Sequence, residues 1–420
     1  MIERYANKKL LVLGGKPTGS TDIVKYAKSM GAYVIVTDYL DQDASPAKQL
    51  ADESWLVSTD DVDTLARLAR ENGVDLVFTA VHEFNISKTI ELAERLELPF
   101  YASRDQWENC ANKDRFKKLC MDFDIPVTRA YDGFDINDLK ASDHIEYPVI
   151  MKPVDSSGGR GVYICIDADE LEKNYEKSLI FSKRQKVLVE RYVSAEEVAI
   201  YYIVQDGEII LSMMADRCVK HFCKGVIPLP YIFKFPSKHL DLYQKTMDCK
   251  VKEMFKFIGI KNGTFFIQSF CDGNQFTFYE MGYRINGSLY YKIMAEIKGL
   301  NPLEMLVDHA MSGKMHERQL KGLINPKHDK KAAILNVIVN PGEVGKIVGL
   351  DEVSLLNGVF DLMVIHKEGT RILEEHIGTL KQIALRVYTI ADTEKELQDL
   401  ADKIRNTIRI WSTEGENMLL

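Results

Sequence analysis

Apolar and polar residues alternate in short blocks along the first hundred positions of the chain. Runs rich in Val, Ile and Leu are separated by longer segments in which apolar residues recur every three to four positions. The pattern predicts strands at 9–13, 33–37 and 74–79 and helices at 21–30, 62–71 and 85–96. Because strands that alternate with helices form parallel sheets with right-handed crossovers, we predict a parallel α/β domain over residues 1–105.

Beyond residue 105 the alternation of strands and helices becomes less regular. The predicted elements are a helix from 112, strands at 149–165 and 186–193, hairpins at 197–214 and 264–281, and a closing helix at 394–405. Hairpins indicate antiparallel sheets. We therefore predict two α+β subdomains over 106–190 and 191–325, followed by a C-terminal lobe over 326–420.

Composition and charge narrow the classes of protein that fit this pattern. The 420 residues are 46% apolar and 28% charged, which is ordinary for a globular enzyme, and the net charge is −8. Since no long block of Lys and Arg occurs, we expect no nucleic acid partner. No apolar run reaches the roughly 20 residues that span a bilayer, and the first residues lack the apolar core of a signal peptide. We therefore expect a cytoplasmic protein without membrane contact.

A glycine-rich loop follows a predicted apolar strand in the middle of the chain. The strand 147–152 ends in Lys152, and Gly158, Gly159 and Gly161 come shortly after it. Glycines let backbone N–H groups approach phosphate oxygens closely, and the strand holds the Lys152 ammonium in a fixed place. Together they predict an anion cradle for a nucleotide.

A second glycine loop, 14–20, follows the first predicted strand. It lacks the Lys that a P-loop carries after its second Gly, and it does not have the Gly-x-Gly-x-x-Gly spacing of a dinucleotide site. Asp38 ends the second strand, where an acid would meet a ribose, but acids are common at such positions. We favour a co-substrate loop or a structural loop over a dinucleotide site.

Two candidate metal ligands lie on the hairpin predicted over 264–281. Gln268 is in its first strand and Glu280 in its second, on either side of a turn at 272–274. Mg²⁺ bound to a nucleotide needs only one or two protein oxygens. The hairpin therefore predicts a metal site with few protein ligands.

Five short motifs follow one another in a fixed order along the chain. They are Asn112-Lys113-Asp114, Met151-Lys152-Pro153, Ser156-Ser157-Gly158-Gly159-Arg160-Gly161, Val189-Glu190-Arg191-Tyr192 and Tyr279-Glu280-Met281-Gly282-Tyr283-Arg284. This order resembles the ATP-grasp superfamily, and in particular its carbamoyl-phosphate-synthase-like and L-amino acid ligase-like carboxylate–amine ligases. The resemblance covers nearly the whole chain and implies that ATP lies between the two α+β subdomains.

The same resemblance implies which residues contact ATP. Lys113 and Lys152 would reach the phosphates, and the lid over them would contain Ser156, Ser157, Gly158, Gly159 and Gly161. The adenine would be bordered by Glu190, Arg191, Tyr192 and Val193. Glu197 would accept the ribose hydroxyls, with Glu196 as the adjacent alternative.

The metal motif departs from the family pattern at two positions. Glu280 resembles the bridging glutamate, but Gln268 stands where a second acid is usual, and Gly282 stands where Asn is common. Glu280 is then the one anionic ligand in the motif. We expect ATP and Mg²⁺ as cofactors, with Mn²⁺ able to substitute, and we expect weak occupancy of a second metal position.

The implied reaction is attack of a carboxylate on the γ-phosphate of ATP, giving ADP and an acyl phosphate that an amine converts to an amide. Catalysis of phosphoryl transfer rests on positioned cations, so Lys152 and Arg284 are the predicted catalytic residues. A carboxylase or kinase-like enzyme is an alternative. A nucleotide-binding module with decayed catalysis is another, kept open by Gln268 and Gly282.

The residues that bind the second substrate are marked less clearly. Asn286, Arg217, Lys220, His82 and Glu83 are the candidates. For Arg217 and Lys220, a solvated basic stretch is an equally good interpretation. The expected partners are a small carboxylate and an amine, and a homodimer is possible for an enzyme of this size.

Overall fold

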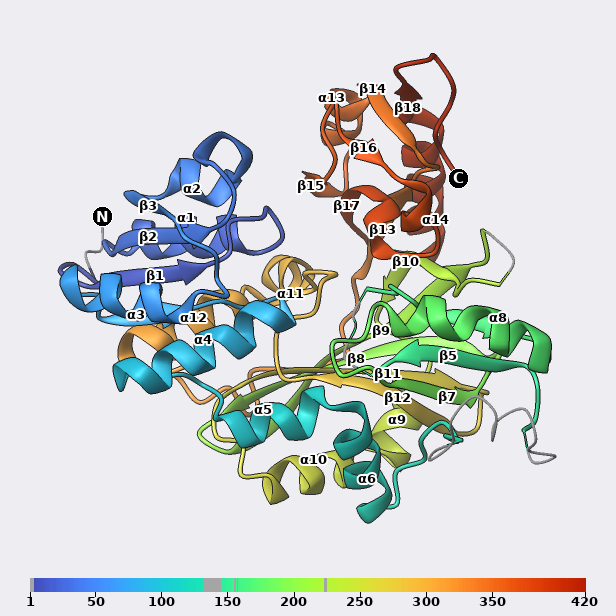
Figure 1. The fold of residues 1–420 in the computed structure, drawn as a ribbon, viewed down its shortest axis with the longest axis horizontal. Helices are drawn as coiled ribbons and strands as arrows, with labels where there is room; N and C mark the ends of the chain where they lie inside the picture. The colour runs from blue at the N-terminus through green and yellow to red at the C-terminus, as the bar shows by residue number, and fades with distance from the viewer. Residues whose placement is uncertain (1–3, 132–144, 155, 157, 223–224) are drawn as a thin grey trace.

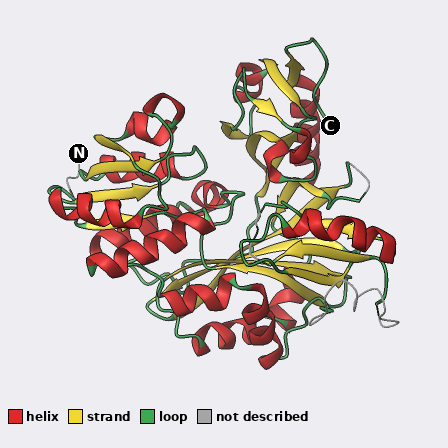
Figure 2. Ribbon diagram, viewed as in Figure 1, coloured by secondary structure: helices red, strands yellow, loops and turns green. Residues whose placement is uncertain are grey.

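The computed structural model describes residues 4–131, 145–154, 156, 158–222 and 225–420. Figure 1 shows an N-terminal lobe in blue, a central lobe in green and yellow, and a C-terminal lobe in orange and red. A parallel sheet comes first and antiparallel sheets follow (Figure 2), so the predicted fold class is confirmed. Among the helices of the described residues, none combines the length and apolar character needed to cross a membrane.

The N-terminal lobe is built on a parallel sheet in the order β3-β2-β1-β4. Its elements are β1 (Lys9–Leu13), α1 (Ser20–Ser29), β2 (Tyr33–Asp38), α2 (Pro46–Leu50), β3 (Glu53–Leu56), α3 (Val62–Glu71), β4 (Leu76–Phe78) and α4 (Glu83–Leu96). The Val, Ile and Leu side chains of β1 and β2 are fully buried, as expected for a parallel sheet covered by helices. The elements α2 and β3 are absent from the predicted pattern because they are too short to show a period.

The carboxylate of Asp38, at the end of β2, is held by neighbouring side chains of the protein. Asp38 Oδ1 lies 2.9 Å from the buried Lys48 ammonium, and Asp38 Oδ2 accepts a hydrogen bond of 2.9 Å from Ser45 Oγ. A Cβ atom at Gly15 would lie 2.4 Å from Asp38 Oδ2, so the second glycine loop packs directly against this cluster. These contacts favour the structural interpretation of that loop.

A small antiparallel sheet, β6-β5-β7, forms one wall of the central lobe. Its strands are β5 (Val149–Pro153), β6 (Tyr163–Cys165) and β7 (Val187–Arg191), and the neighbouring helices are α5 (Arg104–Ala111), α6 (Lys113–Asp122) and α8 (Ala168–Leu179). Asn112 Oδ1 accepts hydrogen bonds from the backbone of Asp114 and Arg115, so it caps α6 at the predicted start. This cap fixes the position of Lys113.

An eight-stranded antiparallel sheet joins the central and C-terminal lobes in the order β12-β11-β8-β9-β10-β13-β17-β15. Its strands are β8 (Glu196–Gln205), β9 (Glu208–Lys220), β10 (Leu229–Phe235), β11 (Gly263–Cys271), β12 (Phe276–Gly282), β13 (Lys331–Ile338), β15 (Val359–Val364) and β17 (Ile383–Ala391). Both predicted hairpins are present. Because β10 pairs with β13, the sheet continues across the predicted boundary at 325/326.

Helices cover this large sheet, and a second small sheet completes the C-terminal lobe. The remaining elements are α9 (Leu240–Thr246), α10 (Asp248–Phe257), α11 (Tyr291–Lys298), α12 (Pro302–Ser312), β14 (Gly342–Val348), α13 (Leu350–Ser354), β16 (Arg371–Ile372), α14 (Glu394–Thr407) and β18 (Arg409–Ser412). In Figure 1, β5 and α8 lie on one side of the large sheet, and α9 and α10 lie on the other. Side chains of α9 and α10 pack with those of β8 and β11 in one apolar cluster, so this face of the sheet belongs to the core.

Candidate active site

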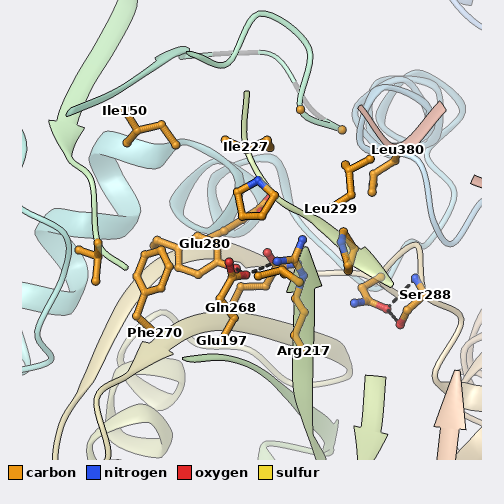
Figure 3. Close-up of a pocket in the computed structure, with 18 of the residues that line it drawn as sticks. Ile150, Glu197, Arg217, Ile227, Leu229, Gln268, Phe270, Glu280, Ser288 and Leu380 are labelled. Carbon is orange, nitrogen blue, oxygen red and sulfur yellow. Dashed lines mark hydrogen bonds and ion pairs between the residues drawn. The ribbon is translucent and has the colours of Figure 1, made fainter. Parts of the chain in front are cut away.

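A cavity of about 300 Å³ lies between the small sheet, the large sheet and the C-terminal lobe. Figure 3 shows Ile150 and Phe270 at one end, and Ser288 and Leu380 at the other, with Glu280 between them. The sequence-predicted residues that line it are Lys152, Gly158, Gly159, Glu190, Arg191, Tyr192, Val193, Glu197, Arg217, Gln268, Glu280, Arg284 and Asn286. Most of the predicted site is thus brought to one place.

A buried cluster of two lysines and one glutamate lies at the small-sheet side of the cavity. Lys152 Nζ is 2.6 Å from Glu190 Oε2, and the ammonium of Lys117 contacts the other carboxylate oxygen. The Glu190 side chain is 1% exposed. Burial opposes ionisation, but the two ammonium groups outweigh it and lower the pKa of Glu190. The Glu190 carboxylate therefore fixes the position of the Lys152 ammonium, and both carboxylate oxygens are engaged in ion pairs.

The glycine loop contacts Lys113 and the C-terminal lobe. Lys113 Nζ donates to the Ser156 carbonyl oxygen over 3.3 Å, and burial together with the nearby Lys152 lowers the pKa of Lys113. Gly158 and Gly159 have φ of 70° and 83°, a region that favours glycine. The Gly158 carbonyl oxygen accepts a hydrogen bond of 3.1 Å from the backbone N–H of Leu380. The predicted contact Ser157 lies outside the described residues.

The two predicted metal ligands face each other across neighbouring strands. Gln268 on β11 pairs directly with Glu280 on β12. The next pair is Ser269 with Phe278, so Tyr279 is the extra residue of a β-bulge. Because of this bulge, both Tyr279 and Glu280 line the cavity, although consecutive residues of a regular strand point to opposite faces. No ion pair joins Glu280 to another described residue.

Glu197 forms a buried cluster with two neighbours from adjacent strands. Its carboxylate makes an ion pair with Arg217 and accepts a hydrogen bond of 2.8 Å from the Tyr279 hydroxyl. Although burial opposes its charge, Glu197 raises the pKa of the Arg217 guanidinium. Arg217 is therefore a cavity residue and not part of a solvated stretch. Lys220, by contrast, is exposed at the end of β9 and does not line the cavity.

Arg284 is held by the N-terminal lobe and by an aromatic ring. Its Nη2 donates to Glu83 Oε1 over 2.7 Å, and its guanidinium lies 4.7 Å from the Phe266 ring centroid. Although burial opposes ionisation, Arg284 holds the pKa of Glu83 below its usual value. A Cβ atom at Gly282 would lie 2.3 Å from the Phe266 ring, which explains the glycine at that position.

Two predicted substrate residues lie behind Arg284 and do not line the cavity. Glu83 is its ion-pair partner, and the His82 Nε2 atom lies 3.0 Å from Thr18 Oγ1. Burial, with Lys16 and Arg284 nearby, lowers the pKa of His82 to about 4. A neutral imidazole in this place supports the βα turn that carries Glu83.

Sequence reasoning missed the part of the cavity that the C-terminal lobe supplies. Arg386 on β17 pairs across the sheet with Asn336 on β13, and Arg386 Nε donates to Asn336 Oδ1 over 2.9 Å. Arg386 also donates to the Gly287 carbonyl oxygen. Beside it, Asn286 Oδ1 accepts a hydrogen bond of 2.5 Å from Ser288 Oγ. Each of Arg386 and Asn336 interrupts an apolar strand, which is a signal that the sequence does contain.

Residues 112–306 match the family model described as the carbamoyl-phosphate synthase L chain, ATP binding domain. Over 195 residues the chain is 27% identical to a formate-dependent phosphoribosylglycinamide formyltransferase of Sulfurisphaera tokodaii, a match that covers 45% of this chain and 48% of the relative. The chain thus spans about half the length of the curated relatives it matches.

Two solved structures resemble the fold over nearly the whole chain. An L-amino acid ligase of Bacillus licheniformis gives a TM-score of 0.79 at 18% identity, covering 97% of this chain and 99% of that one. The biotin carboxylase domain of the 2-oxoglutarate carboxylase of Hydrogenobacter thermophilus, in complex with MgADP and bicarbonate, gives 0.76 at 17% identity, covering 98% and 91%. At these identities the likeness confirms the fold.

Proposed function

From the ATP-grasp domain at residues 112–306, we propose that this protein is an ATP-dependent ligase that joins a small carboxylate to an amine. The carboxylate is activated as an acyl phosphate, and ADP and phosphate are released. The observation that carries this proposal is the composition of one cavity. It contains Lys152 and two glycines of the glycine loop on one side, Glu280 in its centre and an arginine from the C-terminal lobe on the other.

The small-sheet side of the cavity suits ATP. Lys152 lines the cavity beside Gly158 and Gly159, and Lys113 contacts the same loop at the Ser156 carbonyl oxygen. Positive charge beside a glycine loop is suited to phosphate groups. The hydroxyl oxygens of Ser156 and Thr128 are buried without a hydrogen-bond partner among the described residues. Buried polar atoms of this kind are usually satisfied by a ligand or water. These features support nucleotide binding at this side.

The central pair of ligands suits Mg²⁺. Glu280 provides a carboxylate and Gln268 an amide oxygen on directly paired residues, and oxygen atoms are the ligands that Mg²⁺ prefers. When bound with the nucleotide, the ion would neutralise charge on the phosphates. Mn²⁺ as a substitute stays a prediction.

The opposite side of the cavity suits a carboxylate with an apolar substituent. Arg386 is buried, and no carboxylate of the described residues lies within ion-pair distance of it. The apolar side chains of Leu229, Phe233 and Ile383 line the same region. A guanidinium surrounded by apolar groups binds a carboxylate strongly, because few water molecules compete for it.

The proposed reaction has two steps. A carboxylate oxygen attacks the γ-phosphorus of ATP while the bond to the bridging oxygen breaks, and ADP leaves. The amine then attacks the acyl carbon, phosphate leaves, and the amine loses a proton. Lys152 and Arg284 would stabilise the charge that spreads over the transferred phosphoryl group, and the glycine loop would exclude water from the acyl phosphate.

The test is to incubate the purified protein with ATP, Mg²⁺ and pools of carboxylates, with and without amines. ADP, AMP and phosphate are measured together. A parallel reaction contains hydroxylamine, which converts an acyl phosphate to a hydroxamate. Hydroxamate and ADP formed only with particular carboxylates would support the proposal and name the substrate.

Other products would overturn the proposal in identifiable ways. AMP and pyrophosphate would indicate an acyl adenylate and exclude an acyl phosphate. ADP formed with bicarbonate alone would favour the carboxylase alternative, and tight ATP binding without turnover across all pools would favour the binding module. A homodimer and a cytoplasmic location stay predictions.

A further inference from the structure

We propose that the nucleotide site holds a single divalent cation, bound by Glu280, and that Gln268 and Arg217 together exclude a second one. This inference rests on the proposed binding of a nucleotide. It concerns how many metal ions the side chains of this chain can support, which follows from the charges that face the cavity.

Among the described residues, three glutamates line the cavity, and two of them are already neutralised. Glu190 is bound by the ammonium groups of Lys117 and Lys152, and Glu197 is bound by Arg217 and Tyr279. Breaking either cluster to bind a metal would leave a buried cation without its partner, which is costly. Of the carboxylates in the described part of the cavity, Glu280 is therefore the one that remains for a metal ion.

The position opposite Glu280 is occupied by a neutral side chain. Gln268 is its direct cross-strand partner, so the two side chains start from Cβ atoms about 4.5 to 5.5 Å apart on one face of the sheet. An amide oxygen can coordinate Mg²⁺, but it adds no negative charge. Two divalent cations at one carboxylate would have to rely on the phosphates for nearly all of their charge compensation.

An aromatic ring fills the space that a metal-ligating side chain at position 282 would need. Gly282 pairs across the sheet with Phe266, and a Cβ atom at Gly282 would lie 2.3 Å from that ring. The same ring lies under the guanidinium of Arg284 at 4.7 Å. A ligating side chain at position 282 is thus incompatible with the aromatic support of Arg284.

The Arg217 guanidinium, on the same face of the sheet, has a donor that its ion pair does not use. Arg217 lies beside Glu197 in the close-up of Figure 3, and its Nε atom is buried without a hydrogen-bond partner among the described residues. Glu280 is among the groups whose charge acts on Arg217. Because Nε is not used by Glu197, the guanidinium can donate to a phosphate oxygen and so occupy an oxygen that a second metal ion would need.

The experiment counts metal ions bound to the protein with ADP by the paramagnetic resonance of Mn²⁺, while ADP binding is measured separately by calorimetry. The wild-type complex should hold one Mn²⁺. Gln268→Glu should raise the number to two, because it places a second carboxylate opposite Glu280. Gln275→Glu, an exposed position at the turn of the same hairpin, is the matched control and should stay at one.

A second variant keeps the inference testable if Gln268→Glu does not fold. Glu197→Gln combined with Arg217→Gln removes the guanidinium together with its counter-ion, and it should strengthen binding of a second Mn²⁺. Two equally tight Mn²⁺ ions in the wild type, or one ion in both variants, would overturn the inference while nucleotide binding stands. No ADP binding by the wild type would instead overturn the proposed function.

Discussion

Three of the arginines that line the cavity are held in two different ways. Arg217 on β9 and Arg284, just after β12, are each paired with a carboxylate, Glu197 and Glu83. In the C-terminal lobe, Arg386 is held by neutral acceptors, the Asn336 amide oxygen and a backbone carbonyl. The first two guanidiniums are compensated within the protein, whereas no carboxylate of the residues that the structure describes compensates the charge of Arg386.

This difference distinguishes arginines whose charge stabilises the fold from an arginine whose charge can bind a ligand. A buried guanidinium that faces a buried carboxylate costs little further free energy, but removing one partner leaves an uncompensated charge. A guanidinium held by neutral hydrogen-bond acceptors keeps its orientation and its full positive charge, so a carboxylate ligand can form an ion pair with it. We therefore expect substitutions of the paired arginines to affect stability more, and substitution of Arg386 to affect substrate binding more.

The largest effect is expected for Arg217→Gln. The variant leaves Glu197 buried with only the Tyr279 hydroxyl as a partner. The free energy of unfolding should fall by about 3 kcal/mol or more, as is typical when one member of a buried ion pair is removed. Urea denaturation of the variant and the wild type measures this difference.

The control for this prediction removes both charges at once. Glu197→Gln combined with Arg217→Gln should recover most of the lost stability, because no buried charge is left alone. Arg386→Gln should destabilise clearly less than Arg217→Gln. Equal destabilisation by the two single variants would contradict the distinction between paired and dipole-held arginines.

The second effect concerns pH and the turn that supports Arg284. The pKa of His82 is lowered to about 4 from its ordinary value of 6.5, chiefly by burial. Between these values the unfolded chain binds a proton that the folded chain does not, so stability present above 6.5 is lost as the pH falls toward 4. We expect a loss of about 2 kcal/mol between pH 7 and pH 5 from this residue.

His82→Gln isolates that contribution because glutamine does not titrate. The free energy of unfolding of the variant should change less between pH 7 and pH 5 than that of the wild type, by about the same 2 kcal/mol. Glu83 keeps its charge in this window, because its pKa is held below the usual value by Arg284. An identical pH dependence in both proteins would mean that His82 is not held neutral by the fold.

The third effect should appear in substrate binding. Arg386→Gln removes the uncompensated charge, and a charge-assisted hydrogen bond contributes roughly 1.5 to 3 kcal/mol. The KM for the carboxylate identified by the hydroxamate screen should therefore rise about 10- to 100-fold, while the KM for ATP stays nearly constant. Arg371→Gln, at an exposed position of the same lobe, should change neither. A larger change for ATP than for the carboxylate would place Arg386 at the nucleotide.

The sequence allowed the residues on the small-sheet side of the cavity to be predicted, because they come from short local motifs. Lys152 precedes a glycine loop. Gln268 and Glu280 lie on one hairpin, and the turn of that hairpin can be recognised from the sequence. Hydrophobic periodicity also predicts the parallel N-terminal sheet, since each of the three predicted strands is followed by a predicted amphipathic helix.

Other parts of the site depend on contacts between distant segments. Arg386 and Asn336 are 50 residues apart, and Lys117 and Glu190 are 73 residues apart, so neither pairing leaves a local pattern. The bulge at Tyr279 depends on the register between two strands, which alternation alone does not specify. Buried polar residues inside apolar strands are the signal that would have identified Arg386.

The smallest effect is expected for Arg284→Lys, which tests whether an arginine paired with a carboxylate also takes part in catalysis. Lysine keeps the charge and can still reach Glu83, but it lacks the planar fork with which Arg284 donates to Glu83 and to the Ile285 carbonyl oxygen together. We expect kcat to fall about tenfold, which corresponds to about 1.4 kcal/mol of transition-state stabilisation, with an unchanged urea midpoint. Loss of stability without loss of rate would make Arg284 a purely structural partner of Glu83. A loss of rate at constant stability would show that Arg284 acts on the reacting phosphoryl group although it is paired with Glu83. The ion pair would then limit what Arg284 contributes to ligand binding, but not what it contributes to catalysis.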